Sequence, residues 1–495
     1  MKLRRDFHGA LPVLTIDRKD RIPLHKQIYD GYRAAILRGD LRAGEQISSS
    51  RDFAAALKIS RFPVLNAYAQ LLAEGYLESR TGSGTFVSAT LPERLMSPAP
   101  AAGARRPPLS GKRSVSMRSG LYPLFPDSRK VSAWGAFGVH QPALDQFPFA
   151  LWSNLVARHS RNPHVNVVHR IDPCGSQRFR EVVSDYLRTA RGVKCSPDHI
   201  LIVSGSQQAL DLTTRVLLDP GNSVWVEEPG YTLQKITLKA AECKLIPVPV
   251  DSEGMNVAAG IKRAPKARAA FVTPSHQYPL GSTMSASRRI QLLNWAQDSG
   301  AWIVEDDYDS EFRFDSPPIA SLHGLDVNAR VIYIGTFSKV LFPALRLGYL
   351  VVPEDLIDRF KAVRHAMDIF PSYLLQEALA DFILEGHFTR HIRKMRQLYK
   401  AKRTILAETI ALELPAERGF QVHGVEAGMH LALTIPPGSS DLEIAERARA
   451  ARLWLWPLSP SYLGRNPRQG FVLGFGSAAI TDIPRSVQLL KSFLI

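Results

Sequence analysis

A stretch of small and flexible residues divides this 495-residue chain into two unequal parts. Residues 98–118 read PAPAAGARRPPLSGKRSVSMR and contain almost no large apolar side chain. Such a stretch cannot bury enough surface to offset its loss of conformational entropy, so we expect a flexible linker over residues 91–129. The chain is therefore expected to be multidomain, with a head over residues 1–90 and a body over residues 130–495.

The positive charge is concentrated at the start of the chain. The formal net charge is +16, and residues 1–130 hold 22 Lys and Arg against 11 Asp and Glu. About two thirds of the excess therefore lies in the first quarter of the chain. A basic module joined to a nearly neutral body predicts a polyanionic partner for the module, although a solubilising surface would give the same composition.

Several classes of protein are not expected. No apolar run approaches the roughly 18 residues that span a bilayer, and the first residues lack the apolar core of a secretory signal. The three cysteines, Cys174, Cys195 and Cys243, are scattered without the spacing of metal ligands. We expect a cytoplasmic protein with no metal site and no membrane association, in which each cysteine is a small buried apolar residue.

The head is predicted to be mostly helical. Apolar side chains recur at helical spacing in three segments, Gly39 and Gly75 end two of them, and Ser49 or Ser50 can cap the second. The hairpin signal Thr81-Gly82-Ser83-Gly84 follows. The expected elements are helices over residues 24–38, 51–57 and 61–74 and strands over residues 76–79 and 85–88.

Two short helices with a tight turn between them are typical of a helix-turn-helix, whose last helix enters the major groove of DNA by its N-terminal residues. Here these residues are Ser60, Arg61, Phe62 and Asn66. An arginine at this place can make a bidentate contact with guanine, and an asparagine can pair with adenine. The alternative is a solvated helix face.

Two further parts of the head are candidates for contacts with DNA. Arg51 begins the preceding helix and is placed to meet a phosphate. Arg80 and Gly82 belong to the hairpin, which could lie along a neighbouring groove as a wing. A tight turn alone would also explain the glycines.

The body alternates short apolar runs with amphipathic segments. This alternation predicts an α/β fold with a largely parallel sheet covered on both faces. From about residue 375 the pattern changes to a long helical stretch, residues 374–413, followed by strands, which indicates a smaller α+β subdomain over residues 375–495. The expected strands cover residues 200–203, 223–227, 270–273, 301–305 and 330–334, and the clearest helices cover residues 208–217 and 286–297.

The segment Gly335-Thr336-Phe337-Ser338-Lys339 carries the strongest chemical signal in the body. A lysine that forms an imine with an aldehyde must lie beside it and lose its proton readily. The small hydroxyl residues just before the lysine, Thr336 and Ser338, and the guanidinium of Arg346 supply donors for a phosphate group nearby.

Two upstream segments fit the same chemistry. An apolar strand ends in Glu305-Asp306-Asp307, where an α/β sheet binds ligands, and one such aspartate would keep a pyridine nitrogen protonated. Spacing does not choose between Asp306 and Asp307. Ser206 and Gln207 open a helix after a strand and so offer backbone amides to a phosphate.

The head resembles the winged helix-turn-helix domain of the GntR family of bacterial transcription regulators. It departs from that family at Phe62-Pro63, where a polar residue and Thr are usual, and at Ser48, where Pro is common. The resemblance implies that the partner is double-stranded operator DNA, and the departures concern the DNA sequence preferred. The motifs that carry it are Leu41-Arg42-Ala43-Gly44-Glu45, Ser50-Arg51-Asp52 and Glu74-Gly75-Tyr76-Leu77.

The body resembles a fold-type I aminotransferase, specifically the body of MocR-type regulators, which fuse a GntR head to it. The motifs are Val203–Gln208, Glu228–Tyr231, Thr273–Pro279, Glu305–Phe312 and the segment around Lys339. The resemblance implies the pyridoxal 5′-phosphate (PLP)-dependent transferase fold, with PLP bound to Lys339 as an internal aldimine. It also implies pairing of Asp306 with the pyridine nitrogen and of Tyr308 with the ring hydroxyl, stacking by Tyr231, and phosphate contacts by Ser206, Gln207, Thr336 and Arg346.

The body departs from the aminotransferase pattern in three places. Tyr278 replaces an asparagine, for which His276 or Gln277 can substitute. His169 and Arg170 lie where a tyrosine usually reaches the partner subunit. Val472 occupies the place of the arginine that clamps the substrate carboxylate, and Arg465 or Arg468 are the candidates to compensate.

These features together predict a transcription regulator that binds operator DNA and senses PLP itself, an amine or an amino acid through aldimine formation. We expect a head-to-tail homodimer without sustained turnover, because an α-amino acid would be poorly anchored without the clamp. The alternative is an active aminotransferase with an appended DNA-binding head.

Overall fold

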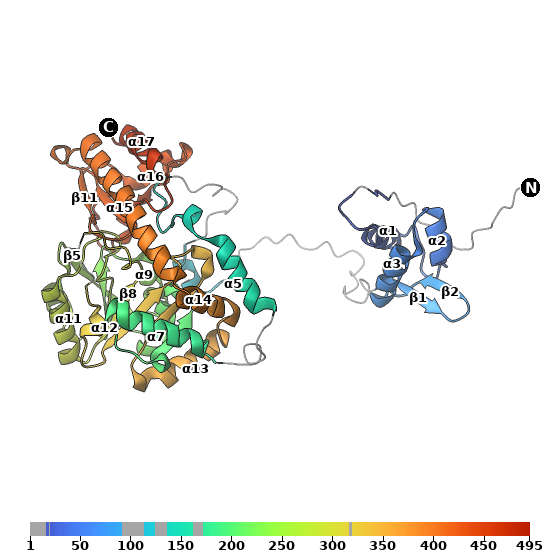
Figure 1. Ribbon diagram of the computed structural model, residues 1–495, viewed down its shortest axis with the longest axis horizontal. Coiled ribbons are helices and arrows are strands. Elements are labelled where there is room, and N and C mark those ends of the chain that lie inside the picture. The colour runs from blue at the N-terminus through green and yellow to red at the C-terminus, as the bar shows by residue number, and fades with distance from the viewer. Residues whose placement is uncertain (1–15, 19, 92–112, 124–135, 162–171, 316–318) are drawn as a thin grey trace, which may run out of the picture. The chain divides into compact units, whose positions relative to one another are not determined.

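The computed structural model describes residues 16–18, 20–91, 113–123, 136–161, 172–315 and 319–495. The chain divides into two compact units, Met1–Ser114 and Val115–Ile495 (Figure 1).

The head consists of three helices and a two-stranded antiparallel hairpin, as predicted. Gly39 ends the first helix in a left-handed conformation, with φ at 84°. Ser49, rather than Ser50, caps the second, because its side chain accepts a hydrogen bond from the amide of Asp52. The elements are α1 (Leu24–Arg38), α2 (Ser50–Ala56), α3 (Arg61–Ala73), β1 (Leu77–Arg80) and β2 (Gly84–Val87).

An aromatic cluster holds the three helices of the head together. The Tyr32 ring packs edge-on against Phe53 and Tyr68, with ring centroids 5.1 and 5.3 Å apart. The hydroxyls of Tyr32 and Tyr68 lie 2.7 Å apart, and Tyr68 donates to the carbonyl of Ser48. Buried hydroxyls therefore find partners in the core, which fixes α3 against α1 and α2.

The body is built on an eight-stranded mixed sheet in the order β3-β10-β9-β8-β7-β4-β5-β6. Strands β9, β8, β7, β4 and β5 are parallel, while β10 runs antiparallel to β3 and β9, and β6 antiparallel to β5. The predicted, largely parallel sheet is thus confirmed. The bounds are β3 (Ile200–Val203), β4 (Ser223–Glu228), β5 (Lys244–Asp251), β6 (Gly254–Met255), β7 (Ala269–Val272), β8 (Trp302–Asp307), β9 (Val331–Thr336) and β10 (Gly348–Val351).

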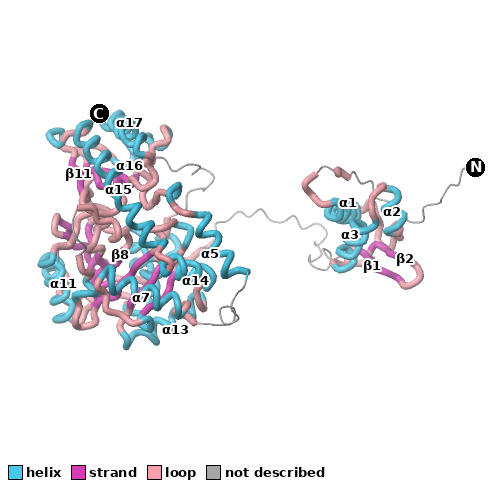
Figure 2. The backbone as a smooth tube through the Cα atoms, viewed as in Figure 1, coloured by secondary structure: helices cyan, strands magenta, loops and turns pink. Residues whose placement is uncertain are grey.

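Helices surround this sheet (Figure 2). Several of its strands are buried on both faces, as β3, β7 and β9 show along their whole length, and this explains their continuous apolar sequences. The helices of this part are α5 (Phe149–Arg161), α7 (Gln177–Arg191), α8 (Ser206–Leu217), α9 (Thr232–Ala240), α10 (Val257–Arg263), α11 (Ala286–Ser299), α12 (Leu322–Leu325), α13 (Ile357–Asp368) and α14 (Tyr373–Leu384).

The C-terminal part is an α+β subdomain with a four-stranded antiparallel sheet in the order β11-β12-β14-β13. The single helical stretch predicted over residues 374–413 was wrong in one respect. Gly386, with φ at 74°, interrupts it and separates α14 from the next helix. The remaining elements are α15 (His387–Glu413), β11 (Gln421–His423), β12 (His430–Thr434), α16 (Asp441–Ala450), β13 (Trp456–Pro457), β14 (Gly470–Gly474) and α17 (Ile483–Leu494).

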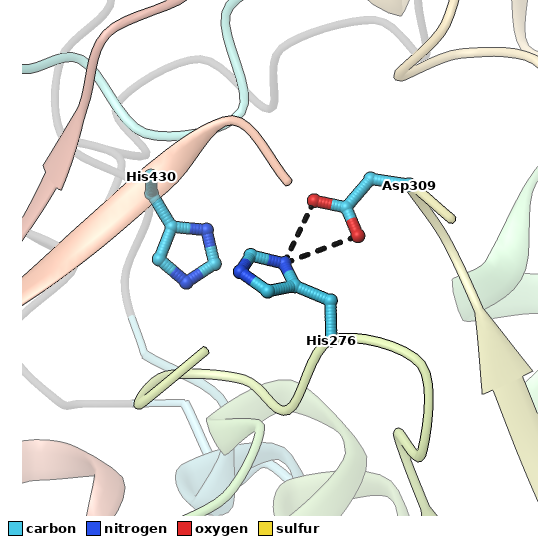
Figure 3. Close-up of side chains that lie close together, drawn as sticks. All are labelled: His276, Asp309 and His430. Atoms are coloured by element: carbon cyan, nitrogen blue, oxygen red, sulfur yellow. Dashed lines mark hydrogen bonds and ion pairs between the residues drawn. The ribbon is translucent and has the colours of Figure 1, made fainter. Parts of the chain in front are cut away.

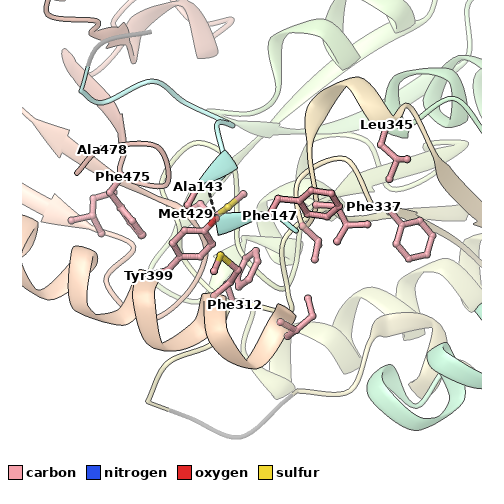
Figure 4. Packing of buried hydrophobic residues seen from close by; sticks show 14 of the residues in the cluster. Ala143, Phe147, Phe312, Phe337, Leu345, Tyr399, Met429, Phe475 and Ala478 are labelled. Carbon is pink, nitrogen blue, oxygen red and sulfur yellow. Dashed lines mark hydrogen bonds between the residues drawn. The ribbon is translucent and has the colours of Figure 1, made fainter. Parts of the chain in front are cut away.

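One apolar core spans both parts of the body (Figure 4). It includes Phe337 beside the large sheet, Tyr399 on α15 and Phe475 at the end of β14. The Tyr399 hydroxyl accepts a hydrogen bond from the backbone amide of Ala143, at 2.9 Å. The loop around Ala143 is therefore anchored to α15 and, with it, the neighbouring His140.

Most of the predicted linker, namely residues 92–112 and 124–129, lies outside the described residues. Within its described part, Met117–Leu121 forms a short 3₁₀ turn, and Arg118 makes an ion pair with Glu242 of the body. No helix in the described part of the chain is both long and apolar enough to cross a membrane.

Candidate functional site

A cavity of about 680 Å³, measured to its open mouth, lies at the carboxyl ends of the central parallel strands. Eight of the nine residues predicted to hold the cofactor line it, and they come from β8, β9, α8 and the loops that follow the strands. His276 is the ninth and lies outside the lining. The lining residues are His140, Gly205, Ser206, Gln207, Tyr231, Thr273, Tyr278, Asp306, Tyr308, Thr336, Ser338, Lys339, Pro343 and Arg346.

Lys339 follows β9 and is buried at this cavity. Burial lowers the pKa of its amine to about 8, and the positive charge of Arg346 acts in the same direction. The carboxylates of Asp309 and Asp306 oppose this effect. The net lowering of the pKa means that a much larger fraction of this amine is deprotonated and nucleophilic near neutral pH than in an ordinary lysine, which favours imine formation.

The two adjacent aspartates of β8 point in different directions. Asp306 lines the cavity, and burial together with the charge of Asp307 raises its pKa to about 7. Asp307 instead pairs with the guanidinium of Arg191 at 2.5 Å and accepts a hydrogen bond from Tyr333. Alternation of side chains along a strand separates the two, so that Asp306 alone of the pair faces the cavity.

One end of the cavity is suited to a phosphate. Helix α8 begins at Ser206 without a side-chain cap, and the N-terminus of such a helix presents free amides and a positive dipole end. The guanidinium of Arg346 lies over Gly205, where an added Cβ would approach it to 3.3 Å. Gln207 donates its side-chain amide to Thr237, which leaves its backbone for this purpose.

His276 lies behind Tyr308, in a buried cluster with Asp309 and His430 (Figure 3). Its Nδ1 is 3.0 Å from Asp309 Oδ2 and 3.1 Å from the Tyr308 hydroxyl. Because an ionised carboxylate only accepts, Nδ1 carries the proton, and the Tyr308 oxygen can only accept from it. The hydroxyl proton of Tyr308 is then free to be donated into the cavity.

The same three side chains are the described residues whose ligand atoms lie close enough together, within 4.8 Å, to hold a metal ion. One nitrogen of each ring already faces a protein group: His276 Nδ1 faces Asp309, and His430 Nε2 lies 3.2 Å from the carbonyl of Pro279. Burial also lowers the pKa of His430 well below its usual value, so this ring is neutral. His276 Nε2 is buried and has no hydrogen-bond partner among the described residues.

The structure adds lining residues that sequence patterns did not single out. His140 lies in an irregular loop about 200 residues before Lys339, and no motif marks it. Burial and the charge of Lys339 hold the pKa of His140 well below its usual range. Ser338 also lines the cavity and is one of the small hydroxyl residues before Lys339 that the sequence pattern already indicated. The ring of Tyr278 packs against those of His140 and Tyr231 at the rim.

An apolar residue, Val472, occupies the position expected to carry a substrate-binding arginine, and its surroundings are apolar as well. Val472 on β14 is fully buried in a cluster with Tyr278 and Tyr308. Arg465 and Arg468 are exposed and do not line the cavity. Arg346 is the one arginine among the described lining residues. His169 and Arg170 lie outside the described residues.

In the head, the residues predicted to contact DNA are exposed, with two of them held by neighbours. Arg61 donates through Nε to the hydroxyl of Ser50 at 3.0 Å, which places its guanidinium between α2 and α3. Arg80 pairs with Glu78 and lies over the ring of Phe86. The remaining candidates, Arg51, Ser60, Asn66 and Gly82, are exposed at the starts of α2 and α3, on α3 and at the hairpin turn.

Comparisons with known proteins agree with both parts of this architecture. Residues 24–87 match the bacterial regulatory proteins of the gntR family, and residues 159–461 match the aminotransferases of class I and II. The chain is 38% identical to a probable rhizopine catabolism regulatory protein, MocR, of Rhizobium meliloti, over 97% of this chain and 95% of that one. It is 30% identical to the pyridoxine biosynthesis regulator PdxR of Corynebacterium glutamicum, over 91% of each chain.

Solved structures similar to the body are aminotransferases. A Pyrococcus horikoshii kynurenine aminotransferase in complex with PMP aligns with a TM-score of 0.69 at 26% identity, over 77% of this chain and 95% of that one. LysN of Thermus thermophilus, complexed with N-(5′-phosphopyridoxyl)-L-leucine, aligns with a TM-score of 0.70 at 25% identity, over 77% and 97%.

The cavity fits the cofactor of these enzymes. Asp306 Oδ1 and Ser338 Oγ line it, are buried and have no hydrogen-bond partner among the described residues. A protonated pyridine nitrogen and a phosphate are the groups that would satisfy an acceptor and a hydroxyl at these places. Together with Lys339, these residues match the chemistry of PLP. The chain belongs to the MocR-type subfamily of GntR transcription regulators, which join a DNA-binding head to a PLP-binding, aminotransferase-like body.

Proposed function

We propose that the body is a sensor in which an amine or amino acid, or PLP itself, changes the affinity of the head for operator DNA. The observation that carries this proposal is the buried Val472 in its apolar cluster. Sustained transamination needs a substrate held in one geometry over many cycles, and a bidentate carboxylate clamp supplies that geometry. By contrast, a sensor needs only to bind its effector.

When bound, PLP supplies an aldehyde that reacts with primary amines and a ring that withdraws electrons. In this proposal Lys339 would hold the cofactor through its side-chain amine, and the same aldehyde chemistry would let an effector amine bind. Asp306 holds a proton against the pyridine nitrogen, and its raised pKa of about 7 favours a shared proton there. Tyr308 donates its hydroxyl proton to the ring oxygen, and Tyr231 stacks on the ring.

The phosphate would be held at the N-terminus of α8 by Ser206 and Gln207, together with Thr336 and with Arg346, whose guanidinium lies over Gly205. These contacts would hold the phosphate of PLP independently of the side chain of Lys339. This makes reversible effector binding possible without loss of the cofactor.

The effector belongs to the class of primary amines. The relatives are named for rhizopine catabolism and for pyridoxine biosynthesis, so one family serves different metabolites. The neutral ring of His140 and the hydroxyls of Tyr278 and Thr273 line the cavity beside the cofactor residues. These groups suit a polar, uncharged substituent on the amine better than a second carboxylate.

Coupling to DNA requires that the effector prefer one of two arrangements of the protein. We infer a head-to-tail homodimer, in which two heads contact paired half-sites of an operator. An effector that binds one arrangement more tightly then shifts operator affinity by the same factor by which DNA shifts effector affinity.

The test uses the full-length, PLP-loaded protein and a panel of primary amines, ω-amino acids and L-α-amino acids. Absorption of the bound cofactor reports reaction with each compound, and fluorescence anisotropy of a bound duplex, at fixed salt, reports operator affinity. We expect a compound that changes both signals without forming product when a keto acid is added. Repeated turnover with a keto acid would instead establish the aminotransferase alternative.

Lys339→Ala is the matched control. It should bind PLP without a covalent bond that borohydride can reduce, and its operator affinity should no longer respond to the effector. A reducible adduct in this variant, detected by mass spectrometry, would contradict the role given to Lys339.

A further inference from the structure

The outer face of α3 is unusual for a helix that meets DNA, because it is mostly apolar. Val64, Ala67, Tyr68 and Leu71 form its buried face. The exposed positions recur at helical spacing on the other side and comprise Arg61, Phe62, Leu65, Asn66, Ala69 and Ala73. Phe62 is 69% exposed and Leu65 is 42% exposed. A surface helix normally places polar side chains there.

From this face we propose that the head recognises thymine methyl groups in the major groove, with Phe62 as the principal contact and Leu65 beside it. Thymine is the base that presents a methyl group in that groove, and apolar side chains are its usual partners. Phe62 lies in the first turn of α3, the part of a recognition helix that reaches base edges. Leu65, three residues on, lies next to it on the same face.

The charges around this face favour DNA over a protein as its partner. Arg51, Lys58 and Arg61 surround the start of α3, and within the described part of the chain none of them forms an ion pair. Arg61 is held toward this seam by its hydrogen bond to Ser50. An apolar centre flanked by unpaired cations is complementary to the floor of a major groove between two phosphate backbones.

The inference rests on DNA binding by the head and adds the chemical group that the head recognises. The probe is a duplex enriched from a random library with the full-length, PLP-loaded protein. Each thymine in it is then replaced by deoxyuridine, which differs only by loss of the methyl group. Affinity is measured by fluorescence anisotropy at fixed salt concentration.

We expect deoxyuridine at one or two positions per half-site to weaken binding about four-fold each, the factor typical of one buried methyl-sized group. Phe62→Ala should bind the thymine duplex more weakly by a similar factor and lose its sensitivity to deoxyuridine at those positions. Phe62→Leu should keep part of that sensitivity. Leu37→Ala is the matched control, because Leu37 is an exposed apolar residue of α1, 45% exposed, outside this face.

Equal affinity of the unaltered protein for thymine and deoxyuridine duplexes would overturn the proposal while leaving DNA binding intact. Unchanged DNA affinity of Phe62→Ala, combined with weaker self-association in sedimentation experiments, would assign the face to a contact between protein chains instead. Failure to enrich any duplex would overturn sequence-specific binding itself, and this proposal with it.

Discussion

His276 Nδ1 lies 3.0 Å from Asp309 Oδ2 in a fully buried layer directly behind Tyr308. This contact fixes the imidazole proton on Nδ1 and turns the Tyr308 hydroxyl into a donor toward the cavity. His276→Gln removes the ring but keeps a polar side chain. We expect the pH midpoint of the absorption change of bound PLP to rise, because a donor to the ring oxygen stabilises its anionic form.

The measurement is a spectrophotometric pH titration of the PLP-loaded variant. His365→Gln, at an exposed position of α13, serves as the control and should leave the midpoint unchanged. An unshifted midpoint in His276→Gln, with the cofactor still bound, would mean that Tyr308 is oriented without help from His276.

The lowered pKa of Lys339 predicts a pH dependence for cofactor loading. The amine is protonated and unreactive below its pKa of about 8 and becomes nucleophilic above it. The rate of covalent loading of the apo protein with PLP should therefore rise through about pH 8 and level off, well below the ordinary lysine value of 10.5. Borohydride quenching and mass spectrometry at timed intervals measure this rate.

A variant that lacks the negative charge of Asp309 tests the direction in which nearby charges move the pKa of Lys339. The Asp309 carboxylate raises the pKa of Lys339, so Asp309→Asn should move the midpoint of the loading profile to lower pH. A midpoint that stays near pH 10 in the unaltered protein, or that moves upward in Asp309→Asn, would contradict this account.

Gly205 is predicted to be required for phosphate binding. Its φ of 105° is unfavourable for other residues, and an added Cβ would approach the Arg346 guanidinium to 3.3 Å. We expect Gly205→Ala to weaken PLP affinity at least ten-fold, roughly 1.4 kcal/mol, by displacing Arg346 and straining the start of α8. Equilibrium dialysis of the apo protein measures the affinity. Gly221→Ala, at φ 84° with open space around it, is the control for backbone strain alone.

Much of this site could be predicted from the sequence, because several of its residues lie in short local motifs. Strand ends and helix starts carry Asp306, Lys339 and Ser206, and the sheet topology then brings them to one edge. His140 could not be found in this way, since its loop reaches the cavity only through tertiary packing against α15. The place of His276 behind Tyr308 could not be predicted either, because neighbouring residues of a loop can point in opposite directions. The break at Gly386 was missed because helical periodicity continues on both sides of it.

The side chain of Glu228 joins the two parts of the body, and we expect its removal to have a large effect on stability. Glu228 accepts hydrogen bonds from the backbone amides of Leu463 and Gly464 and pairs with Lys235 at 3.0 Å. Glu228→Ala leaves the buried Lys235 ammonium with the Ser461 carbonyl but without its carboxylate, and removes the acceptor of the half-buried Leu463 amide and the exposed Gly464 amide. We expect the free energy of unfolding of the body to fall by about 2–4 kcal/mol. Urea titration followed by circular dichroism measures it.

The control for the Glu228 contacts is an ion pair on the surface. Glu446→Ala removes a partner of Arg449 on the surface of α16 and should change the free energy of unfolding by less than about 0.5 kcal/mol. Equal effects of the two substitutions would mean that the Glu228 contacts contribute no more than a solvated ion pair.

Arg61 and Lys58 should affect DNA binding in different ways, since one is held in place and the other is not. The hydrogen bond from Arg61 to Ser50 orients its guanidinium at the start of α3, where a bidentate contact with guanine is possible. Arg61→Ala should lower affinity for a selected duplex by about 1–3 kcal/mol and relax the preference at one base pair. Lys58→Ala should weaken binding equally for selected and random duplexes and reduce the salt dependence by about one phosphate contact. Anisotropy titrations at several salt concentrations separate the two, and a uniform loss in Arg61→Ala would assign Arg61 to the phosphate backbone instead.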